Sequence, residues 1–210
     1  MDFELTQEQQ MVLEMARNFA EREVKPVANQ MDRDGVFPGE LVAKLGQLGL
    51  LAVFVPVDLG GSGMDFISYI LALEEISKAW ASLGVIMSLE NSLICETIVK
   101  FGADHQKQKY LPLVASGKQL GCYALTEPSA GSDAGAIQTQ AKKNGDGYLI
   151  NGSKIFITCG KNAEIAIVYA VTDTARGKQG ISAFIVEKGT PGFSVGKIED
   201  KLGLRASDTA

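Results

Sequence analysis

The hydrophobic period of this chain changes near residue 118, and that change limits the folds that it can adopt. Before it, apolar residues recur every three to five positions, as between residues 11 and 24, which predicts amphipathic helices. After it, short apolar runs such as residues 165–171 alternate with Gly-rich turns, which predicts strands. We therefore expect an α+β fold: an all-α domain at residues 1–118, then an antiparallel β-barrel or sandwich at residues 119–210.

Several residues predict where the first helices begin and end. Thr6 and Gln9 have the spacing of a capping box, in which each side chain satisfies the backbone N–H of the other residue. Pro26 interrupts or bends the helix that follows, and Gly35 supplies its stop. Pro38 suits the first turn of the next helix.

The most apolar predicted helix covers residues 82–101 and is apolar on all sides, which indicates burial in a helical bundle. Ser88, Glu90, Asn91 and Ser92 interrupt it, and buried polar groups of this kind must face a partner, water or a cavity. Satisfaction within the core and a ligand pocket are both open interpretations.

The second half of the chain reads as strands separated by turns. Residues 142–147 predict a hairpin, and Asn151-Gly152 is a strong two-residue turn signal. The expected strands beyond the first apolar run at 121–125 are residues 148–150, 154–158, 165–171, 181–186 and 193–195.

The loop after residue 125 joins the end of an apolar run to a set of polar groups. Thr126, Ser129 and Ser132 supply hydroxyls, and the backbone around Gly131 can turn its amide donors toward an anion. Polar groups at the end of an apolar strand are typical of a ligand site.

Two further residues extend this candidate site. Phe156 and Thr158 are two positions apart on an expected strand, so they would share one face of the sheet. An aromatic ring beside hydroxyl groups suits a flat heteroaromatic cofactor that carries phosphates. A polar turn with one core aromatic is the alternative that the residues alone leave open.

Composition and missing motifs exclude several classes of function. A net charge of −5 argues against nucleic-acid binding, and we expect no membrane helix because no apolar run approaches about 20 residues. The acidic, polar N-terminal segment resembles neither a signal nor a transit peptide, so we expect a cytoplasmic protein with reduced, core-filling cysteines. The chain has no metal-ligand cluster, nucleophile–His–acid set, Walker motif or Rossmann motif.

Three motifs in order resemble the acyl-CoA dehydrogenase family. They are Tyr-Ala-Leu-Thr-Glu-Pro-Ser-Ala-Gly-Ser-Asp at 123–133, Asn-Gly-Ser-Lys-Ile-Phe-Ile-Thr at 151–158, and Lys-Leu-Gly-Leu-Arg at 201–205 followed by Ser-Asp-Thr at 207–209. Residues 84–93 and Phe101-Gly102 resemble the short-chain, butyryl-CoA branch. The similarity spans essentially the whole chain.

This resemblance implies an N-terminal helical domain and a middle β-domain that cradles FAD. Thr126 would bond the pyrimidine edge of the flavin, Phe156 would pack on its ring, and Thr158 would donate to N5. Ser132 would meet both the flavin pyrophosphate side and the CoA thioester portion of the substrate. The cofactor-binding residues implied in this way are Tyr123, Ala124, Leu125, Thr126, Gly131, Ser132, Phe156, Ile157 and Thr158.

The implied activity is dehydrogenation of a short-chain, butyryl-CoA-like acyl-CoA to the 2-enoyl-CoA in fatty acid metabolism. Electrons would pass to an electron-transfer flavoprotein, and the full-length protein would be a homotetramer. The family's glutamate base would lie beyond Ala210, in a C-terminal four-helix bundle, so we assign no catalytic residue and expect this chain alone to be inactive. Neither Glu90 nor Glu127 matches that role.

Two alternatives remain at this stage. An acyl-CoA oxidase-type flavoenzyme would share the fold but pass its electrons to oxygen. A truncated family member would serve as a non-catalytic module that binds acyl-CoA or another protein.

Overall fold

The computed structural model describes residues 4–210, so the first three residues of the polar N-terminal segment lie outside the described residues. The chain divides into two compact units. The first is helical and contains Met1–Leu120 together with Asp200–Asp208; the second contains Gly121–Glu199 and Thr209–Ala210. The sequence assigned residues 200–208 to the second domain, whereas in the structure they pack with the helical unit.

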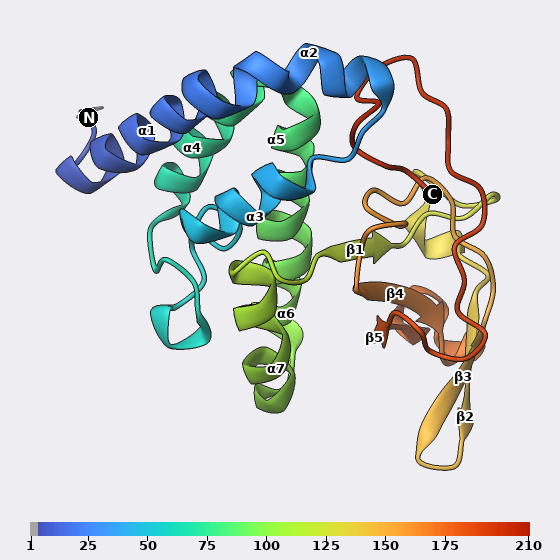
Figure 1. Ribbon diagram of the computed structural model, residues 1–210. Helices are drawn as coiled ribbons and strands as arrows, with labels where there is room; N and C mark the ends of the chain where they lie inside the picture. Colours follow the sequence, from blue (N-terminus) through green and yellow to red (C-terminus); the bar gives the residue numbers. More distant parts are fainter. Residues whose placement is uncertain (1–3) are drawn as a thin grey trace. The chain divides into compact units, whose positions relative to one another are not determined.

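The helical unit is built from helices that occupy most of residues 7–115 (Figure 1). Two π-helical turns, Ala20–Val24 and Leu89–Cys95, continue the helices that precede them. The α-helices are α1 (Gln7–Phe19), α2 (Lys25–Asp34), α3 (Gly39–Gln47), α4 (Phe66–Ala79), α5 (Ala81–Ser88), α6 (Glu96–Phe101) and α7 (Asp104–Ala115).

The helix ends follow the capping signals in the sequence. The Gln9 amide donates to Thr6 Oγ1 at 3.2 Å, and the Thr6 amide donates to Gln9 Oε1 at 3.0 Å, so the predicted capping box is confirmed. Gly35 ends α2 with a φ of 66°, a left-handed conformation that glycine adopts without a Cβ clash. Pro26 lies in the first turn of α2, directly after the π-helical turn Ala20–Val24, so the predicted interruption coincides with a local change from α-helical to π-helical hydrogen bonding.

The stretch Ala81–Phe101 is the central helical segment of this unit. It has 21 residues, and the mean hydropathy of its most apolar window is 1.3; by length and composition it could cross a membrane, so the expectation of no run of that length was wrong. However, 61% of its most apolar window is buried inside the structure. A core helix has the same length and composition, so these two properties are weak support for a membrane span.

The second unit contains a five-stranded mixed sheet within the described residues. Its strands are β1 (Gly121–Ala124), β2 (Gln140–Asn144), β3 (Gly147–Asn151), β4 (Ile165–Val171) and β5 (Ile181–Glu187). β4 is central: it pairs in parallel with β1 and, at one position, with β2, and it pairs antiparallel with β5. β2 and β3 form the predicted antiparallel hairpin. The antiparallel prediction is therefore only partly confirmed, because β1 and β4 run in the same direction.

Two expected strands are absent from the described structure. Residues 193–195 are not paired, and residues 154–158 form an irregular segment rather than a pleated strand. Phe156 has a φ of 57°, which lies in the left-handed region and breaks an extended conformation. The prediction that Phe156 and Thr158 share a sheet face was therefore wrong, and Asn151-Gly152 does not connect two strands of a hairpin.

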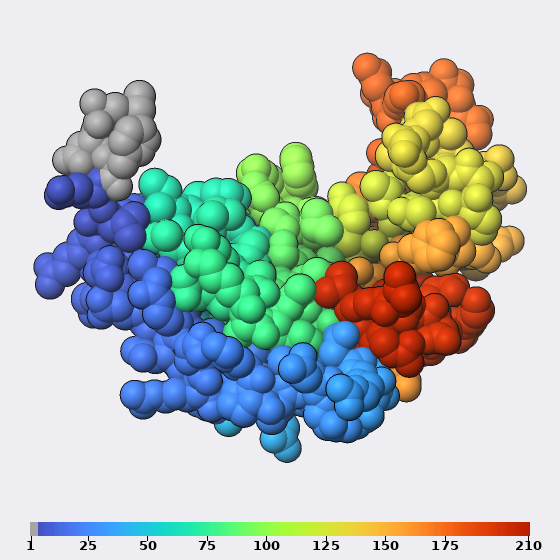
Figure 2. All heavy atoms as spheres, turned by 90° about the horizontal axis from the view of Figure 1, so that it is seen from above, coloured from blue at the N-terminus to red at the C-terminus, as the bar shows by residue number. Residues whose placement is uncertain are grey.

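Within the helical unit, the returning segment Asp200–Asp208 lies beside the end of α2 (Figure 2). Ala206 and Ser207 are each only 1% exposed. The end of this segment, Ala206–Asp208, is thus buried although it is far from the helices in sequence, whereas residues 202–205 are exposed.

Candidate functional site

The candidate loop begins where β1 ends. Ala124 is buried, and the Tyr123 hydroxyl donates a 2.8 Å hydrogen bond to the Tyr169 hydroxyl on β4. Burial raises the pKa of Tyr123, and the bond to Tyr169 raises it further, so its hydroxyl stays protonated at neutral pH. The hydrogen bond to β4 and the burial of Ala124 therefore fix the position of the end of β1, where the loop begins.

A tight turn follows at residues 127–130. Glu127 and Ala130 exchange backbone hydrogen bonds of 2.9 and 3.1 Å. The Glu127 side chain is 4% exposed and accepts hydrogen bonds from the backbone amides of Gln138 at 2.6 Å and Thr139 at 2.9 Å. This carboxylate therefore connects the loop to the segment that leads into β2.

Glu127 also forms a buried ion pair with Lys154, whose side chain is 9% exposed. The Nζ–Oε1 distance is 2.8 Å, and the same Nζ donates to the Leu125 carbonyl at 3.0 Å. Burial alone would raise the pKa of Glu127, but hydrogen bonds from Lys154 and the two amides hold it at about 2. Burial lowers the pKa of Lys154, and Glu127 opposes that effect.

The segment after Lys154 lies directly against the loop. The Ile155 amide donates to the Thr126 carbonyl at 2.9 Å. Phe156, in its left-handed conformation, leaves its side chain 62% exposed. Ile157 is buried, and its backbone exchanges hydrogen bonds of 2.8 and 2.9 Å with Ala210. The loop and this segment therefore present an exposed aromatic ring next to Thr126.

The hydroxyl and backbone amide groups of Thr126 and Thr158 are available as hydrogen-bond donors near the Phe156 ring. Thr158 and Thr209 form the antiparallel bridge next to the hydrogen-bonded Ile157–Ala210 pair. Hydrogen-bonded and non-hydrogen-bonded pairs alternate in such pairing, so the Thr158 amide points away from Thr209. Within residues 4–210, neither the hydroxyl nor the amide of Thr126 or Thr158 has a hydrogen-bond partner. Both residues are half-buried, so their donors are accessible to a ligand.

Gly131 and Ser132 lie beyond the tight turn and are exposed. A Cβ added at Gly131 would meet nothing within 4 Å, so space is open beside its backbone. The structure thus brings Leu125 and Thr126 together with the segment at 155–158. It places Gly131 and Ser132 on an open part of the same loop.

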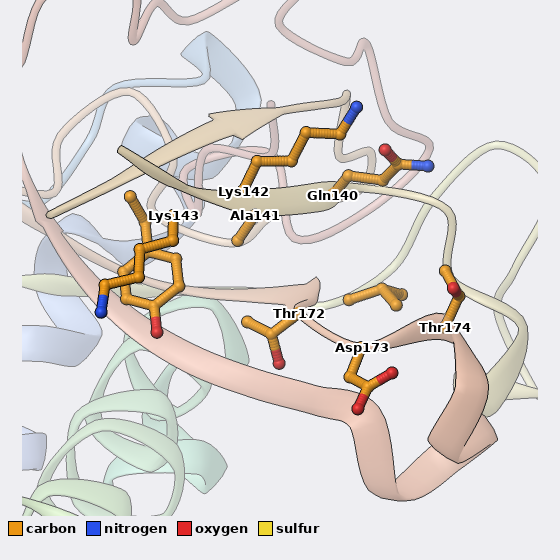
Figure 3. Close-up of a pocket in the computed structure, with 9 residues that line it drawn as sticks. Gln140, Ala141, Lys142, Lys143, Thr172, Asp173 and Thr174 are labelled. Carbon is orange, nitrogen blue, oxygen red and sulfur yellow. The ribbon is translucent and has the colours of Figure 1, made fainter. Parts of the chain in front are cut away.

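A hollow of about 600 Å³ lies elsewhere in this unit (Figure 3). It is lined by residues 140–143 of β2, Tyr148 of β3 and residues 171–174. None of the nine predicted site residues lines it. Its Lys142, Lys143 and Asp173 are surface side chains, and we assign no role to it.

The polar residues of the central helix have a structural explanation. The Asn91 carboxamide accepts from the Val53 amide at 2.8 Å and donates to the Leu50 and Met87 carbonyls at 2.8 and 2.9 Å. Ser92 donates to the Ser88 carbonyl at 2.7 Å. For Asn91 and Ser92, the interpretation that their polar groups form hydrogen bonds within the core is therefore correct, and a ligand pocket is not needed to explain them.

Sequence reasoning missed the Glu127–Lys154 ion pair. A signal was present: each charged residue lies within a motif between apolar or small neighbours, and a charge held in such surroundings requires a partner. The spacing of 27 residues gave no reason to choose this partner over the other lysines.

Comparison with known proteins identifies the family. Residues 6–118 match the acyl-CoA dehydrogenase N-terminal domain, and residues 122–210 match the acyl-CoA dehydrogenase middle domain. The chain belongs to the acyl-CoA dehydrogenase family. Its helical unit and its mixed sheet therefore correspond to two successive domains of that family.

Relatives within the family are similar over the whole chain. The short-chain specific acyl-CoA dehydrogenase of Clostridium acetobutylicum is 52% identical over 209 residues, which is 100% of this chain and 55% of the relative. Acryloyl-CoA reductase (NADH) of Anaerotignum propionicum is 44% identical over 100% of this chain and 54% of the relative. The chain thus spans about half the length of the curated relatives that it matches.

Solved structures of family members superpose closely. Butyryl-CoA dehydrogenase from Megasphaera elsdenii has a TM-score of 0.95 at 46% identity, covering 100% of this chain and 56% of that one. A chain in the structure of the electron transferring flavoprotein of Acidaminococcus fermentans, from work on flavin-based electron bifurcation, has a TM-score of 0.97 at 49% identity, covering 100% and 55%. Glutaryl-CoA dehydrogenase from Mycobacterium smegmatis in complex with FADH2 has a TM-score of 0.91 at 34% identity, covering 98% and 52%.

The cofactor of this family is FAD, and the candidate site fits it. A flavin has a flat ring for an aromatic side chain to pack on and a polar edge that accepts hydrogen bonds. The second unit offers the exposed Phe156 ring and the unused donors of Thr126 and Thr158. The open backbone at Gly131 leaves room for a phosphate to approach its amides.

Proposed function

We propose that the complete protein is an FAD-dependent short-chain acyl-CoA dehydrogenase that oxidises butyryl-CoA-like thioesters to 2-enoyl-CoA. The observation that carries this proposal is the grouping of Thr126, Phe156 and Thr158, which offers an exposed ring and unused donors in one place. The relatives named as short-chain specific and butyryl-CoA dehydrogenases support the substrate class.

Each residue of the grouping has a distinct role in this proposal. Thr126 binds the pyrimidine edge of the flavin, Phe156 packs on the ring, and Thr158 donates toward N5. Ser132 and Gly131 serve the pyrophosphate side, and Ser132 also serves the thioester portion of the substrate. Bound FAD supplies the acceptor for the hydride that leaves the β-carbon of the acyl group.

The buried acidic group of this loop, Glu127, cannot act as the base that removes the α-proton. The Glu127 carboxylate already accepts three hydrogen bonds, and its pKa is about 2, far below that of a base suited to neutral pH. Glu127 is therefore structural, and we assign no catalytic residue among those of the loop.

The first test is reduction of bound flavin by substrate. The complete protein should purify with FAD, and butyryl-CoA added without oxygen should bleach the oxidised-flavin absorbance. Longer acyl-CoAs should bleach it more slowly. A complete protein that binds no FAD, or whose FAD resists every acyl-CoA tested, would refute the proposal.

We further propose an electron-transfer flavoprotein as electron acceptor, because a closely similar chain occurs in the structure of such a flavoprotein. Turnover should then require the flavoprotein, whereas peroxide formation in its absence would favour the oxidase alternative. The relative named acryloyl-CoA reductase (NADH) makes the reverse reaction a second candidate. Consumption of NADH with a 2-enoyl-CoA would support that candidate.

The quaternary structure is also part of the proposal. We propose that the complete protein is a homotetramer, as the resemblance to the family implies. Light scattering during gel filtration should give four times the mass of one subunit. The mass of a monomer at the protein concentration of the assay would contradict this.

A further inference from the structure

The Lys154 ammonium group contacts the residues on both sides of Thr126. It donates to the Leu125 carbonyl at 3.0 Å and to the Glu127 carboxylate at 2.8 Å. One residue further along, the Ile155 amide donates to the Thr126 carbonyl at 2.9 Å. Three contacts thus join the loop at 125–127 to the segment that carries Phe156 and Thr158.

The carboxylate end of this ion pair is fixed just as fully. Glu127 accepts from the Gln138 and Thr139 amides, and its own backbone closes the tight turn with Ala130. The position of the Glu127 carboxylate is therefore fixed by the segments before β2 and after β1. Because Lys154 binds this carboxylate, the start of the segment at 155–158 is held at a fixed place relative to the loop. The side chains of the pair are 4% and 9% exposed, so solvent screens the interaction little.

We propose that Glu127 and Lys154 are positioning residues for the flavin: the pair sets the distance and orientation between Thr126 and the Phe156–Thr158 segment. This inference rests on the proposed function. Neither charged group touches the cofactor in our proposal. Both act through the backbone of the residues that do.

A buried ion pair is a poor device for stability alone. Removing two charges from water is costly, and apolar residues of similar size often stabilise a fold equally well or better. The pair instead fixes the relative orientation of the two chain segments, because its hydrogen bonds hold the Leu125 carbonyl and the Glu127 carboxylate at defined positions. A ligand whose ring edge receives hydrogen bonds from both segments binds well only if these two segments are held in the correct relative position.

The single variants Lys154→Met and Glu127→Gln in the complete protein test this directly. Each should raise the dissociation constant of FAD by about tenfold to a hundredfold, the effect of removing a supporting group at well-studied metal sites. Each should also shift the absorbance bands of the flavin that remains bound, because its polar edge meets displaced donors. Unchanged FAD affinity and an unchanged flavin spectrum in both variants would overturn the proposal.

The double variant Glu127→Leu/Lys154→Met separates positioning from stability. Two apolar side chains leave no unpaired buried charge, so the thermal unfolding temperature should lie above that of Lys154→Met, although the Gln138 and Thr139 amides lose their carboxylate acceptor. FAD affinity and the flavin spectrum should not recover. If both recover together with the unfolding temperature, the pair only stabilises the fold and the inference is wrong.

A conservative variant and a matched control complete the experiment. Lys154→Arg keeps the charge and should retain more FAD affinity than Lys154→Met; it also serves if Lys154→Met does not fold. Lys188 and Glu164 form an ion pair of 3.0 Å in the same unit, but both side chains are about half exposed. Lys188→Met should leave FAD affinity and the flavin spectrum unchanged.

The same measurements distinguish this inference from the proposed function. If the wild-type protein binds no FAD, the proposed function fails and the inference fails with it. If the wild type binds FAD and is reduced by butyryl-CoA while the single variants bind FAD equally well, only the inference fails.

Discussion

The Asp32 carboxylate accepts a hydrogen bond from the Ala206 amide at 3.3 Å, across 174 residues of sequence. The same oxygen accepts from Trp80 Nε1 at 3.1 Å and from the Ser82 hydroxyl. Burial would raise the pKa of Asp32, but these hydrogen bonds lower it below its ordinary value. One carboxylate thus ties α2, the start of α5 and the returning segment into a single unit.

Replacing Asp32 should release the returning segment. Asp32→Ala removes the acceptor of three donors, so we expect trypsin to cleave faster after Lys201 and Arg205, by about fivefold or more. The free energy of unfolding should fall by about 3 kcal/mol, the size expected for hydrogen bonds to a charged group. Fluorescence of Trp80, the single tryptophan of the chain, provides the unfolding signal.

The matched control is Asp34→Ala, which removes an exposed carboxylate that bonds only the Gln30 side chain, at 2.6 Å. Its cleavage rate and unfolding should resemble those of the wild type. Equal cleavage rates in Asp32→Ala and wild type would show that the segment is held by other contacts.

Loss of the Asn91 side chain should destabilise the helical unit strongly. Asn91→Ala leaves the Val53 amide and the Leu50 and Met87 carbonyls without their side-chain partner in a fully buried place. Unsatisfied buried groups cost about 1–3 kcal/mol each, so we expect a loss of about 3–5 kcal/mol. Urea unfolding followed by Trp80 fluorescence measures it.

Ser92→Ala is the neighbouring control. Ser92 bonds only to the carbonyl one helical turn before it, so its loss should cost less than about 1 kcal/mol. If the two variants were equally stable, the Asn91 contacts would contribute little.

The stability of the second unit should depend on Glu127 in acid. Its pKa is about 2 in the folded chain, against an ordinary value of 4.5, so folding favours the charged carboxylate. The resulting stabilisation, about 3 kcal/mol, is fully present above pH about 4.5 and is lost as the pH falls toward about 2. Unfolding temperatures measured between these values should fall more steeply for the wild type than for Glu127→Gln. Parallel curves would contradict this.

Two glycines of the second unit, Gly152 and Gly131, should respond differently to substitution by alanine. A Cβ at Gly152 would lie 2.2 Å from Thr139 Oγ1 and 2.8 Å from Thr139 Cα, so Gly152→Ala should cost about 1–3 kcal/mol through overpacking. A Cβ at Gly131 meets nothing within 4 Å, so Gly131→Ala should leave stability unchanged. Thermal unfolding of both variants tests the contrast, and equal losses would contradict it.

The sequence predicted those features that depend on neighbours along the chain. The Thr6 capping box, the stop at Gly35 and the β2–β3 hairpin all involve residues a few positions apart, and the structure confirms them. The three ordered motifs identified the family, and the domain matches confirm that identification.

What the sequence did not predict depends on distant contacts. The parallel pairing of Gly121 with Ile165 joins segments separated by the whole β2–β3 hairpin, and no local pattern encodes it. The run at 154–158 alternates like a strand, but Lys154 binds Leu125 and Glu127, and Phe156 takes a left-handed conformation. These tertiary contacts override the local preference for an extended strand.

The central place of β4 has a consequence for the order in which the sheet assembles. β4 and β5 are close in sequence and can pair as soon as both are free, whereas the parallel partner β1 must close a long loop first. Pulse-labelled hydrogen exchange during refolding should therefore protect the amides of β5 before those of β1. The candidate loop, which begins where β1 ends, would be among the last parts of this unit to take its shape.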